Sequence, residues 1–361
     1  MNNKTTSFNN FYKIHSKEQK KYINNINKKF SFKKVKDLIS KLLSIRVLVV
    51  GEAIIDQYVF CEALGKSGKE PILVLRKINT DQYYGGALAI SNNISSFCNS
   101  VKLFTMIGEK KEYKKDIVKN NKKNISVKFF YKNNSPTIVK KRFVDSINKN
   151  KILGVYEIND DLMDTKQQDN IQTQLSKLKG KVDHVVIADY GHGFISEKTA
   201  KYLSSMCKSI SLSAQLNATS NFRINTINKY KKIQTLVINE MELRQEMQDR
   251  TSQIKILMKK LTKKIQLQYL IVTRGVNGSI FYDKKHNQFS VCPEFSSNVV
   301  DKVGAGDAML SVVSIALNAG IDKHLSLLLG SLASSQSIET MGPGMSINKN
   351  KILNSIKSLL K

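Results

Sequence analysis

Short apolar runs recur along the chain, and each ends at a small or polar residue where a turn can begin. Runs of this kind are typical of strands that are buried on both faces of a parallel sheet. Helix-like stretches separate them, and this alternation predicts an α/β fold with a mostly parallel, doubly wound sheet flanked by helices. The runs lie at residues 47–50, 101–108, 182–189, 235–239 and 269–275.

Two further stretches, 71–80 and 137–145, carry β-branched residues and partly alternate between apolar and polar side chains. That pattern is typical of strands with one exposed face. We therefore predict a small β-sheet lid with strands at 57–62, 71–80 and 136–158, attached to a main domain at 46–361.

Residues 1–45 precede the first apolar run and are rich in lysine. Their apolar positions recur close to the helical period, which predicts helix. These positions are Ile23, Ile26, Phe30, Val35, Leu38, Leu42 and Leu43. We expect a basic, helical extension outside the main domain, which acts either as a vestigial linker or as a docking helix.

The charge of the chain is strongly unbalanced, with 58 Lys and Arg against 29 Asp and Glu and a formal net charge of +29. Such an excess is common in nucleic-acid binders. Two segments, 1–46 and 102–151, hold most of it, with net charges of +10 and +11. Neither adds a recognised binding module or the aromatic and arginine platforms that bind bases. We interpret the charge as a solvated, Lys-rich surface and expect no nucleic-acid partner.

The four cysteines are widely scattered, form no C-x-x-C pair and have no histidine at ligand spacing. This argues against a zinc site and against a disulfide framework. No apolar run approaches the ~20 residues that cross a bilayer, and the N-terminus has no apolar signal region. We therefore expect a cytoplasmic protein with no membrane partner.

The segment 299–320 carries the clearest chemical signal. Gly304, Ala305 and Gly306 form a turn without bulky side chains, and an apolar helix begins near Asp307. A helix N-terminus offers unpaired N–H groups and partial positive charge, so this turn can hold a phosphoryl group. A carboxylate there can accept a proton from an attacking hydroxyl. Taken alone, these residues are equally compatible with a plain strand-to-helix turn and an acidic cap.

Residues 301–307, Asp-Lys-Val-Gly-Ala-Gly-Asp, resemble the D-T-x-G-A-G-D signature of the ribokinase-like carbohydrate kinases, the PfkB family, with lysine in place of threonine. The resemblance implies a ribokinase-like fold and ATP as co-substrate. It also implies that Asp307 is the general base on a sugar hydroxyl. The amides of Gly304, Ala305, Gly306 and Asp307 would then form an anion hole for the transferred phosphoryl group.

Two further motifs match the sugar-binding part of that family. Asp56 closes the G-E-A-I-I-D stretch and matches the acid that binds sugar hydroxyls, a role that suits a carboxylate because it accepts two hydrogen bonds. Gly85 and Gly86 match a Gly-Gly turn that lies at the sugar site.

Two later motifs match the nucleotide-binding part. The N-x-x-E motif at Asn239 and Glu242 is associated in the family with Mg²⁺ and phosphate, and carboxylate-linked waters suit this ion. The T-x-G-x-x-G motif, which lies beside ATP in the family, supplies Thr273, Arg274, Gly275 and Gly278. Taken singly, each of these motifs also fits an ordinary helix cap or turn. Because all of them occur in the same order as in the family, together they favour the family.

Within the family the likeness is strongest to the kinase half of the bifunctional heptose-7-phosphate kinase/adenylyltransferases, the ADP-heptose synthases, and covers about residues 46–361. It includes P-T-I-V-K-K-R-F-V-D, with Lys140 and Arg142 in register. Paired cations suit a substrate that already bears a phosphate, and a charged lid surface is an equal alternative. The resemblance implies a role in nucleotide-sugar biosynthesis and, through the lid, a homodimer.

The chain departs from the heptose kinases at three places. Ala89 replaces a substrate-contacting asparagine, although Asn93 keeps the next position. Residues 189–193 read D-Y-G-H-G in place of D-Y-x-K-G, and residues 213–217 replace a D-P-K stretch. Because of these changes the sequence does not specify which acceptor is bound. The residues of the implied base and anion hole are intact. No H-x-G-H motif occurs, so we expect no nucleotidyltransferase activity.

The sequence therefore predicts a phosphotransferase that uses ATP and Mg²⁺ to phosphorylate a hydroxyl of a sugar or sugar phosphate. One alternative keeps the fold and changes the acceptor to a nucleoside or a vitamin precursor. Another is a basic binding protein or pseudokinase without activity. The intact Gly304 to Asp307 set argues against the last, because a binding protein has no chemical need of it.

Overall fold

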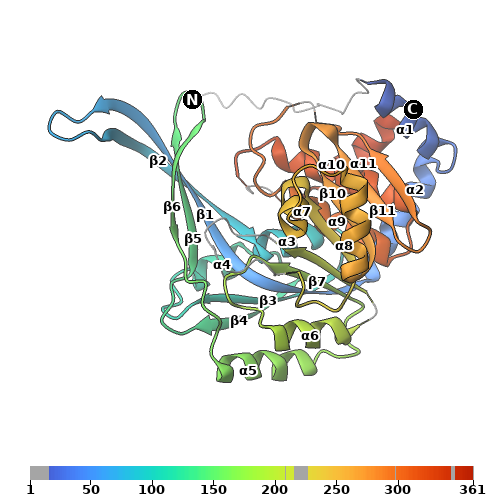
Figure 1. Ribbon diagram of the computed structural model, residues 1–361, viewed down its shortest axis with the longest axis horizontal. Helices are drawn as coiled ribbons and strands as arrows, with labels where there is room; N and C mark the ends of the chain where they lie inside the picture. Colours follow the sequence, from blue (N-terminus) through green and yellow to red (C-terminus); the bar gives the residue numbers. More distant parts are fainter. Residues whose placement is uncertain (1–15, 208, 215–226, 297, 343–345, 361) are drawn as a thin grey trace.

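The centre of the molecule is a mostly parallel β-sheet (Figure 1). The computed structural model describes residues 16–207, 209–214, 227–296, 298–342 and 346–360. Strands lie in the order β12-β11-β10-β9-β8-β7-β1-β3-β4, parallel from β4 to β10, with β11 and β12 antiparallel at one edge. The strands are β1 (Arg46–Lys66), β3 (Ser100–Gly108), β4 (Ile125–Lys132), β7 (His184–Asp189), β8 (Ile210–Ala214), β9 (Lys232–Asn239), β10 (Gln266–Thr273), β11 (Ser279–Asp283) and β12 (Gln288–Cys292). This sheet confirms the predicted fold class.

Helices cover both faces of the sheet, which explains why its central strands are continuous apolar runs. In Figure 1, α5 and α6 lie below the sheet, and α9 and α10 lie above it. The helices are α1 (Lys17–Asn27), α2 (Phe32–Ser40), α3 (Ala87–Ile94), α4 (Lys114–Asn120), α5 (Thr165–Ser176), α6 (Glu197–Met206), α7 (Glu240–Met247), α8 (Ile254–Lys264), α9 (Ala305–Asn318), α10 (Lys323–Ile338) and α11 (Lys349–Leu359). Short 3₁₀ turns lie at Lys41–Ser44 and Gly275–Asn277. None of the helices in the described ranges has the length and apolar character that crossing a bilayer requires.

The lid grows out of the central sheet, because β1 continues without a break beyond the layer of helices. Its outer part pairs antiparallel with β2 (Leu73–Gly86) and parallel with β5 (Ile138–Asp145), and β5 pairs with β6 (Lys151–Glu157). These strands lie on the left of Figure 1, where the ends of β1 and β2 extend to the upper left and β5 and β6 run upward. The predicted lid segments at 57–62, 71–80 and 136–158 fall on them.

The N-terminal extension is helical where it is described, but it does not lie outside the main domain as expected. In Figure 1, α1 and α2 lie beside α10 and α11, at the end of the molecule away from the lid. Their apolar side chains belong to the same core as the central strands, because an apolar stripe at helical spacing needs a surface to cover it. These side chains are Tyr22, Ile23, Ile26, Val35 and Ile39.

Candidate active site

The turn before α9 has the geometry of an anion site. Gly304 caps the helix with φ at +87°, in the left-handed region that favours glycine. Its carbonyl accepts the Ala308 N–H at 2.9 Å, which starts the helical hydrogen bonding. The first N–H groups of a helix have no partner within it. Here they belong to Ala305, whose N–H donates to the Lys302 carbonyl at 3.4 Å, and to Gly306 and Asp307. A Cβ placed on Gly306 would meet no atom within 4 Å, so the turn faces open space.

Asp307 lies in the first turn of α9 and is half-buried. Burial raises the pKa of its carboxyl to about 7, against the lowering effect of a hydrogen bond from Tyr190. The Tyr190 hydroxyl donates to Asp307 Oδ1 at 2.9 Å. The negative charge of Asp56 raises this pKa further, and the positive charge of Lys140 lowers it. A carboxylate poised near neutral pH suits a general base.

Three of the predicted motifs meet in one pocket of about 450 Å³. Two of its walls come from the ends of β9 and β10, and a third comes from the turn before α9. Apolar side chains such as Val237, Val299 and Met309 complete it. The predicted residues that line it are Asn239, Glu242, Thr273, Gly275, Gly278, Gly304, Ala305, Gly306, Asp307 and, from the lid, Arg142.

Asn239 and Glu242 form a helix cap as well as part of this pocket. Asn239 Oδ1 accepts the Glu242 N–H, and Glu242 Oε2 accepts the Asn239 N–H, each at 2.8 Å. Burial raises the pKa of Glu242 to about 7, and the nearby charge of Asp307 adds to this. No group of three His, Cys, Asp or Glu that could enclose a metal occurs in the described ranges. The side-chain oxygens of Asn239 and Glu242 suit an ion held mostly by water and substrate phosphates, as Mg²⁺ commonly is.

Arg274 differs from its neighbours in the T-x-G-x-x-G motif. Its Nε donates to Glu240 Oε2 at 3.1 Å, and Glu240 also pairs with Arg244. Its backbone N–H donates to the Gly278 carbonyl at 2.8 Å, which closes the turn. The structure thus places the Arg274 side chain toward α7, whereas Thr273 and Gly278 line the pocket.

On the lid side, the predicted sugar-binding residues contact one another. Asp56 is 3% exposed and forms an ion pair with Arg142 of β5. A Cβ on Gly85 would lie 2.2 Å from Asp56 Oδ2, so only glycine fits beside this carboxylate. Lys140 lies next to Asp56 on the paired strand, and burial lowers the pKa of its ammonium group. Gly86 caps α3.

A second pocket, of about 380 Å³, lies on the other side of Gly304. Ala89 and Asn93 line it, and Asn93 Oδ1 accepts the Ile347 N–H at 3.0 Å. The remaining lining residues, which the sequence analysis did not single out, are Gln82, Tyr83, Tyr84, Asn92, Asn120, Lys122, Ser337 and Ser346. Amide, hydroxyl and phenol groups therefore dominate this pocket.

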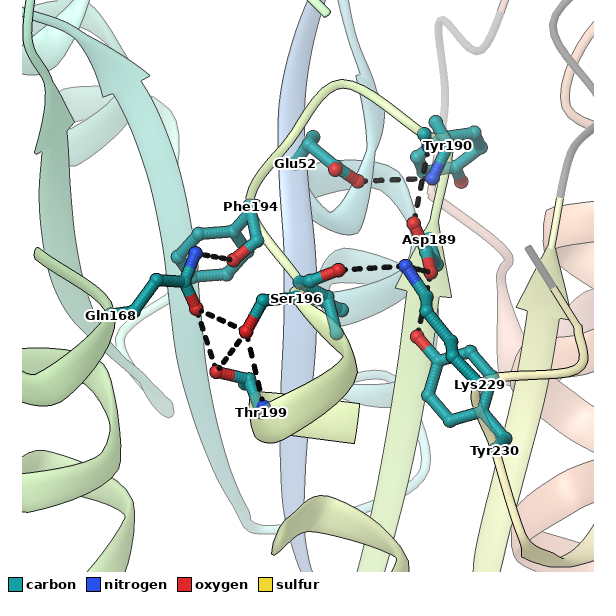
Figure 2. Close-up of polar contacts among 11 residues, drawn as sticks. Glu52, Gln168, Asp189, Tyr190, Phe194, Ser196, Thr199, Lys229 and Tyr230 are labelled. Carbon is teal, nitrogen blue, oxygen red and sulfur yellow. Dashed lines mark hydrogen bonds and ion pairs between the residues drawn. The ribbon is translucent and has the colours of Figure 1, made fainter. Parts of the chain in front are cut away.

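A buried group of charged residues holds Tyr190 in place, and the sequence analysis did not predict it (Figure 2). Glu52 is fully buried, its Oε2 accepts the Tyr190 N–H at 3.0 Å, and burial raises its pKa to about 7. Asp189 pairs with Lys229 at 2.6 Å and accepts from the Tyr230 hydroxyl at 2.7 Å. The sequence did contain a signal for this group. In each of the neighbouring parallel strands β1 and β7, an acidic residue, Glu52 or Asp189, directly follows the last residue that pairs the two strands.

The loop after Tyr190 is also anchored. Figure 2 shows Gln168 of α5 donating to the Phe194 carbonyl at 3.2 Å and accepting from Ser196 and Thr199 at the start of α6. Within this loop His192 replaces the expected lysine, and its Nδ1 lies 2.7 Å from Asp160 Oδ1. Burial lowers the pKa of His192. Of the altered stretch 213–217, residues 215–217 lie outside the described residues.

The first residue of the signature joins the site to the lid. Asp301 is buried, and its carboxylate accepts from the Tyr58 hydroxyl and from Lys151 Nζ, each at 2.6 Å. Tyr58 lies on β1 and Lys151 on β6. The loop that leads into α9 is therefore tied to the lid by two side chains.

Comparison with known proteins identifies relatives of this fold and sequence. The family described as pfkB family carbohydrate kinase matches residues 44–350. The bifunctional protein HldE of Haemophilus influenzae (strain PittEE) is 26% identical over 302 residues, covering 82% of this chain and 60% of that protein. HldE of Campylobacter jejuni (strain 81116) is 22% identical over 314 residues, with 85% and 64% covered. The chain thus spans about three-fifths of the length of the curated relatives it matches.

Solved structures share the fold at low identity. Phosphofructokinase-2 of Escherichia coli, in complex with fructose-6-phosphate, has a TM-score of 0.69 and 13% identity, covering 88% of this chain and 100% of that chain. Ribokinase of Thermotoga maritima has a TM-score of 0.65 and 16% identity, covering 88% and 99%. The ribokinase-like architecture predicted from the sequence is therefore confirmed.

Proposed function

Because the chain belongs to the pfkB family of carbohydrate kinases, we propose that it transfers the γ-phosphoryl group of ATP to a hydroxyl of a sugar or sugar phosphate. One observation carries the proposal. Three motifs, at residues 239–242, 273–278 and 304–307, line a single pocket together with Arg142 of the lid, and the Gly304 to Asp307 turn forms one of its walls. Phosphoryl transfer depends mainly on positioning and charge stabilisation, and this arrangement offers both.

Asp307 is the general base of the proposed reaction. Tyr190 donates to its Oδ1, which leaves Oδ2 as the oxygen that we assign to the acceptor hydroxyl. The carboxylate takes the hydroxyl proton as the acceptor oxygen bonds to the γ-phosphorus, and the bond from that phosphorus to the β-phosphate oxygen breaks. ADP leaves with the electron pair of the broken bond. The proton returns to solvent when Asp307 ionises again.

The amides of Gly304 to Asp307 stabilise the transferred group. They lie at the positive end of the α9 dipole, so negative charge on the phosphoryl oxygens is favoured there. Asn239 and Glu242 would hold Mg²⁺ through water. When bound, this ion offsets charge on the phosphates. Thr273, Gly275 and Gly278 form the wall beside which the rest of ATP lies.

We propose a phosphate-bearing sugar, with heptose phosphates the first to test, as the acceptor. Lys140 and Arg142 are partly buried beside Asp56, where cations can bind phosphate oxygens and the carboxylate can accept from hydroxyls. The HldE relatives support this choice at 22–26% identity. Such a reaction would belong to nucleotide-sugar biosynthesis, and a cytoplasmic location goes with the use of ATP.

We propose that the lid is covered by a second copy of the chain. Large apolar side chains are exposed on its strands β2 and β6, and the lid of a free monomer would leave them in water. The most exposed include Leu73, Ile78 and Leu153, at 54–56%. Sedimentation of the purified protein at micromolar concentration tests this directly, and a monomer would contradict it.

A screen of ATP turnover tests the proposed function. The purified protein with Mg²⁺ is offered sugars, sugar phosphates, nucleosides and vitamin precursors, and ADP formation is measured against a reaction without acceptor. We expect acceptor-dependent ADP formation with at least one sugar phosphate. Turnover only with nucleosides would show that the acceptor is a nucleoside and not a sugar phosphate. Absence of turnover, together with salt-sensitive RNA or DNA binding, would contradict the proposal and favour a non-catalytic binding protein.

A further inference from the structure

Helix α1 lies outside the part of the chain that matches the family, which begins at residue 44. It nevertheless docks on the end of the molecule that carries the nucleotide motifs. Gln19 Nε2 donates to the Glu294 carbonyl at 2.6 Å, and the Tyr22 hydroxyl donates to the His324 carbonyl at 2.8 Å. Gln19 and Tyr22 are both less than a tenth exposed, so these contacts are made in the packed interface.

Glu294 belongs to a wall of the 450 Å³ pocket. Its Oε1 accepts from the Phe295 and Ser296 N–H groups at 2.9 and 2.8 Å, and from Ser335 Oγ at 2.7 Å. Glu294 is therefore fixed from the inner side of the wall by its side chain. Gln19 fixes its backbone carbonyl from the outer side.

The same wall touches the turn of the T-x-G-x-x-G motif. A Cβ on Gly278 would lie 2.1 Å from the Cys292 carbonyl oxygen and 2.9 Å from the Glu294 nitrogen. No space separates the two backbones, so a shift of Glu294 is passed to the turn at Gly275 to Gly278. A further cavity, of about 650 Å³, lies between α1 and this region and shares Val276 and Glu294 with the nucleotide pocket.

We propose that α1 is a positioning element of the nucleotide site, with Gln19 as its positioning residue. This inference rests on the proposed function, because it concerns the same pocket. The Gln19 side chain contacts both the start of α1 and the wall of the pocket. Its Oε1 accepts the Ser16 N–H at 2.9 Å and completes the cap of α1, while its Nε2 holds the wall. The start of α1 and the Glu294 carbonyl are thus held in a fixed position relative to each other.

The substitution Gln19→Glu tests the proposal, because it keeps the size and the capping oxygen but removes the N–H donor to Glu294. We expect the KM for ATP to rise about two- to tenfold, the range that follows from losing one hydrogen bond of typical net strength. The kcat and the KM for the acceptor should stay within about twofold. Gln19→Met, of similar length, loses both the donor and the capping oxygen, so the KM for ATP should rise at least as much.

Tyr22→Phe is the matched control. It also removes one hydrogen bond between α1 and a backbone carbonyl, that of His324 at the start of α10, together with a side-chain contact to the Cys292 thiol, and it leaves the contact of Gln19 with Glu294 in place. We expect a lower Tm and an unchanged KM for ATP. If Gln19→Glu and Tyr22→Phe both lowered the Tm and left the KM for ATP unchanged, α1 would only stabilise the fold, and the proposal would be overturned.

A binding measurement separates this proposal from the proposed function. The Kd for ATP is measured by calorimetry for the full-length wild type and the same variants. If no acceptor supports turnover, the proposed function fails, while a Kd raised only by the Gln19 substitutions still supports the role of α1. Absence of ATP binding by the wild type would overturn both.

Discussion

The nucleotide side and the lid side of the site are built differently. On the nucleotide side, the residues of three motifs line one open pocket, and backbone groups of the α9 turn form one of its walls. On the lid side, Asp56 is paired with Arg142 and packed against Gly85, so the predicted residues contact each other. The adjoining 380 Å³ pocket is lined mainly by residues outside the motifs.

This difference separates the chemistry from the choice of acceptor. An anion site made from a glycine turn and a helix N-terminus depends on backbone geometry, which a short motif can specify. A site for a particular sugar depends on the side chains that several strands and loops bring together. The departure at Ala89 lies in the 380 Å³ pocket, and the Gly304 to Asp307 turn is intact.

The largest expected effect comes from Asp307→Asn on the nucleotide side. Asparagine keeps the shape but cannot take a proton, so kcat should fall about 10²- to 10⁴-fold. The Kd for ATP should change little, since the turn and its amides remain. Turnover and calorimetric binding are measured on the same preparation. A kcat within about tenfold of the wild type would show that Asp307 is not the base.

A smaller effect is expected from Gly304→Ala, with Gly320→Ala as its control at the other end of α9. Both glycines have positive φ, at +87° and +71°. Alanine in this region costs roughly 1–2 kcal/mol, so both variants should lose similar free energy of unfolding. Only Gly304→Ala displaces the anion hole, and we expect its kcat/KM to fall at least about tenfold.

Urea unfolding and steady-state kinetics check this pair. If Gly320→Ala lost as much activity as Gly304→Ala, the effect would reflect the stability of α9. The special role of the turn would then be contradicted.

Ala89→Asn sharpens the comparison from the lid side. Asparagine fills part of the 380 Å³ pocket and adds an amide, so the ratio of kcat/KM between a bulky and a small acceptor should fall by about tenfold. The KM for ATP should be unchanged and serves as the internal control. If kcat/KM fell equally for every acceptor and ATP binding also weakened, the nucleotide side and the lid side would not act separately.

The sequence carried enough information to predict the fold class, the strands β1, β3, β7, β9 and β10, the lid segments and the Gly304 to Asp307 turn. Apolar runs and glycine turns are local patterns, and each dictates its own backbone. The α9 helix begins at Ala305, close to the predicted start. Strands β4, β8, β11 and β12 were not predicted, and in β4 the apolar residues partly alternate with polar ones inside a Lys-rich stretch.

Contacts between segments that are far apart along the chain could not be predicted from the sequence. Asp56 and Arg142 were each predicted at the substrate site, but their pairing depends on how β5 lies along β1. Tyr190 was noted only as part of a motif, and its bond to Asp307 joins residues 117 positions apart. The periodicity of α1 predicted a helix and could not say which surface it covers.

In the proposed reaction Asp307, held by Tyr190, takes the acceptor proton, and the pH dependence of kcat tests this role most directly. Asp307 must be ionised to act, so kcat should rise with pH through a midpoint near the pKa of about 7. Tyr190→Phe removes the hydrogen bond that favours the charged carboxylate, so the pKa and the midpoint should move to higher pH. A kcat that does not vary across this range, or a midpoint that stays in place in Tyr190→Phe, would contradict the account.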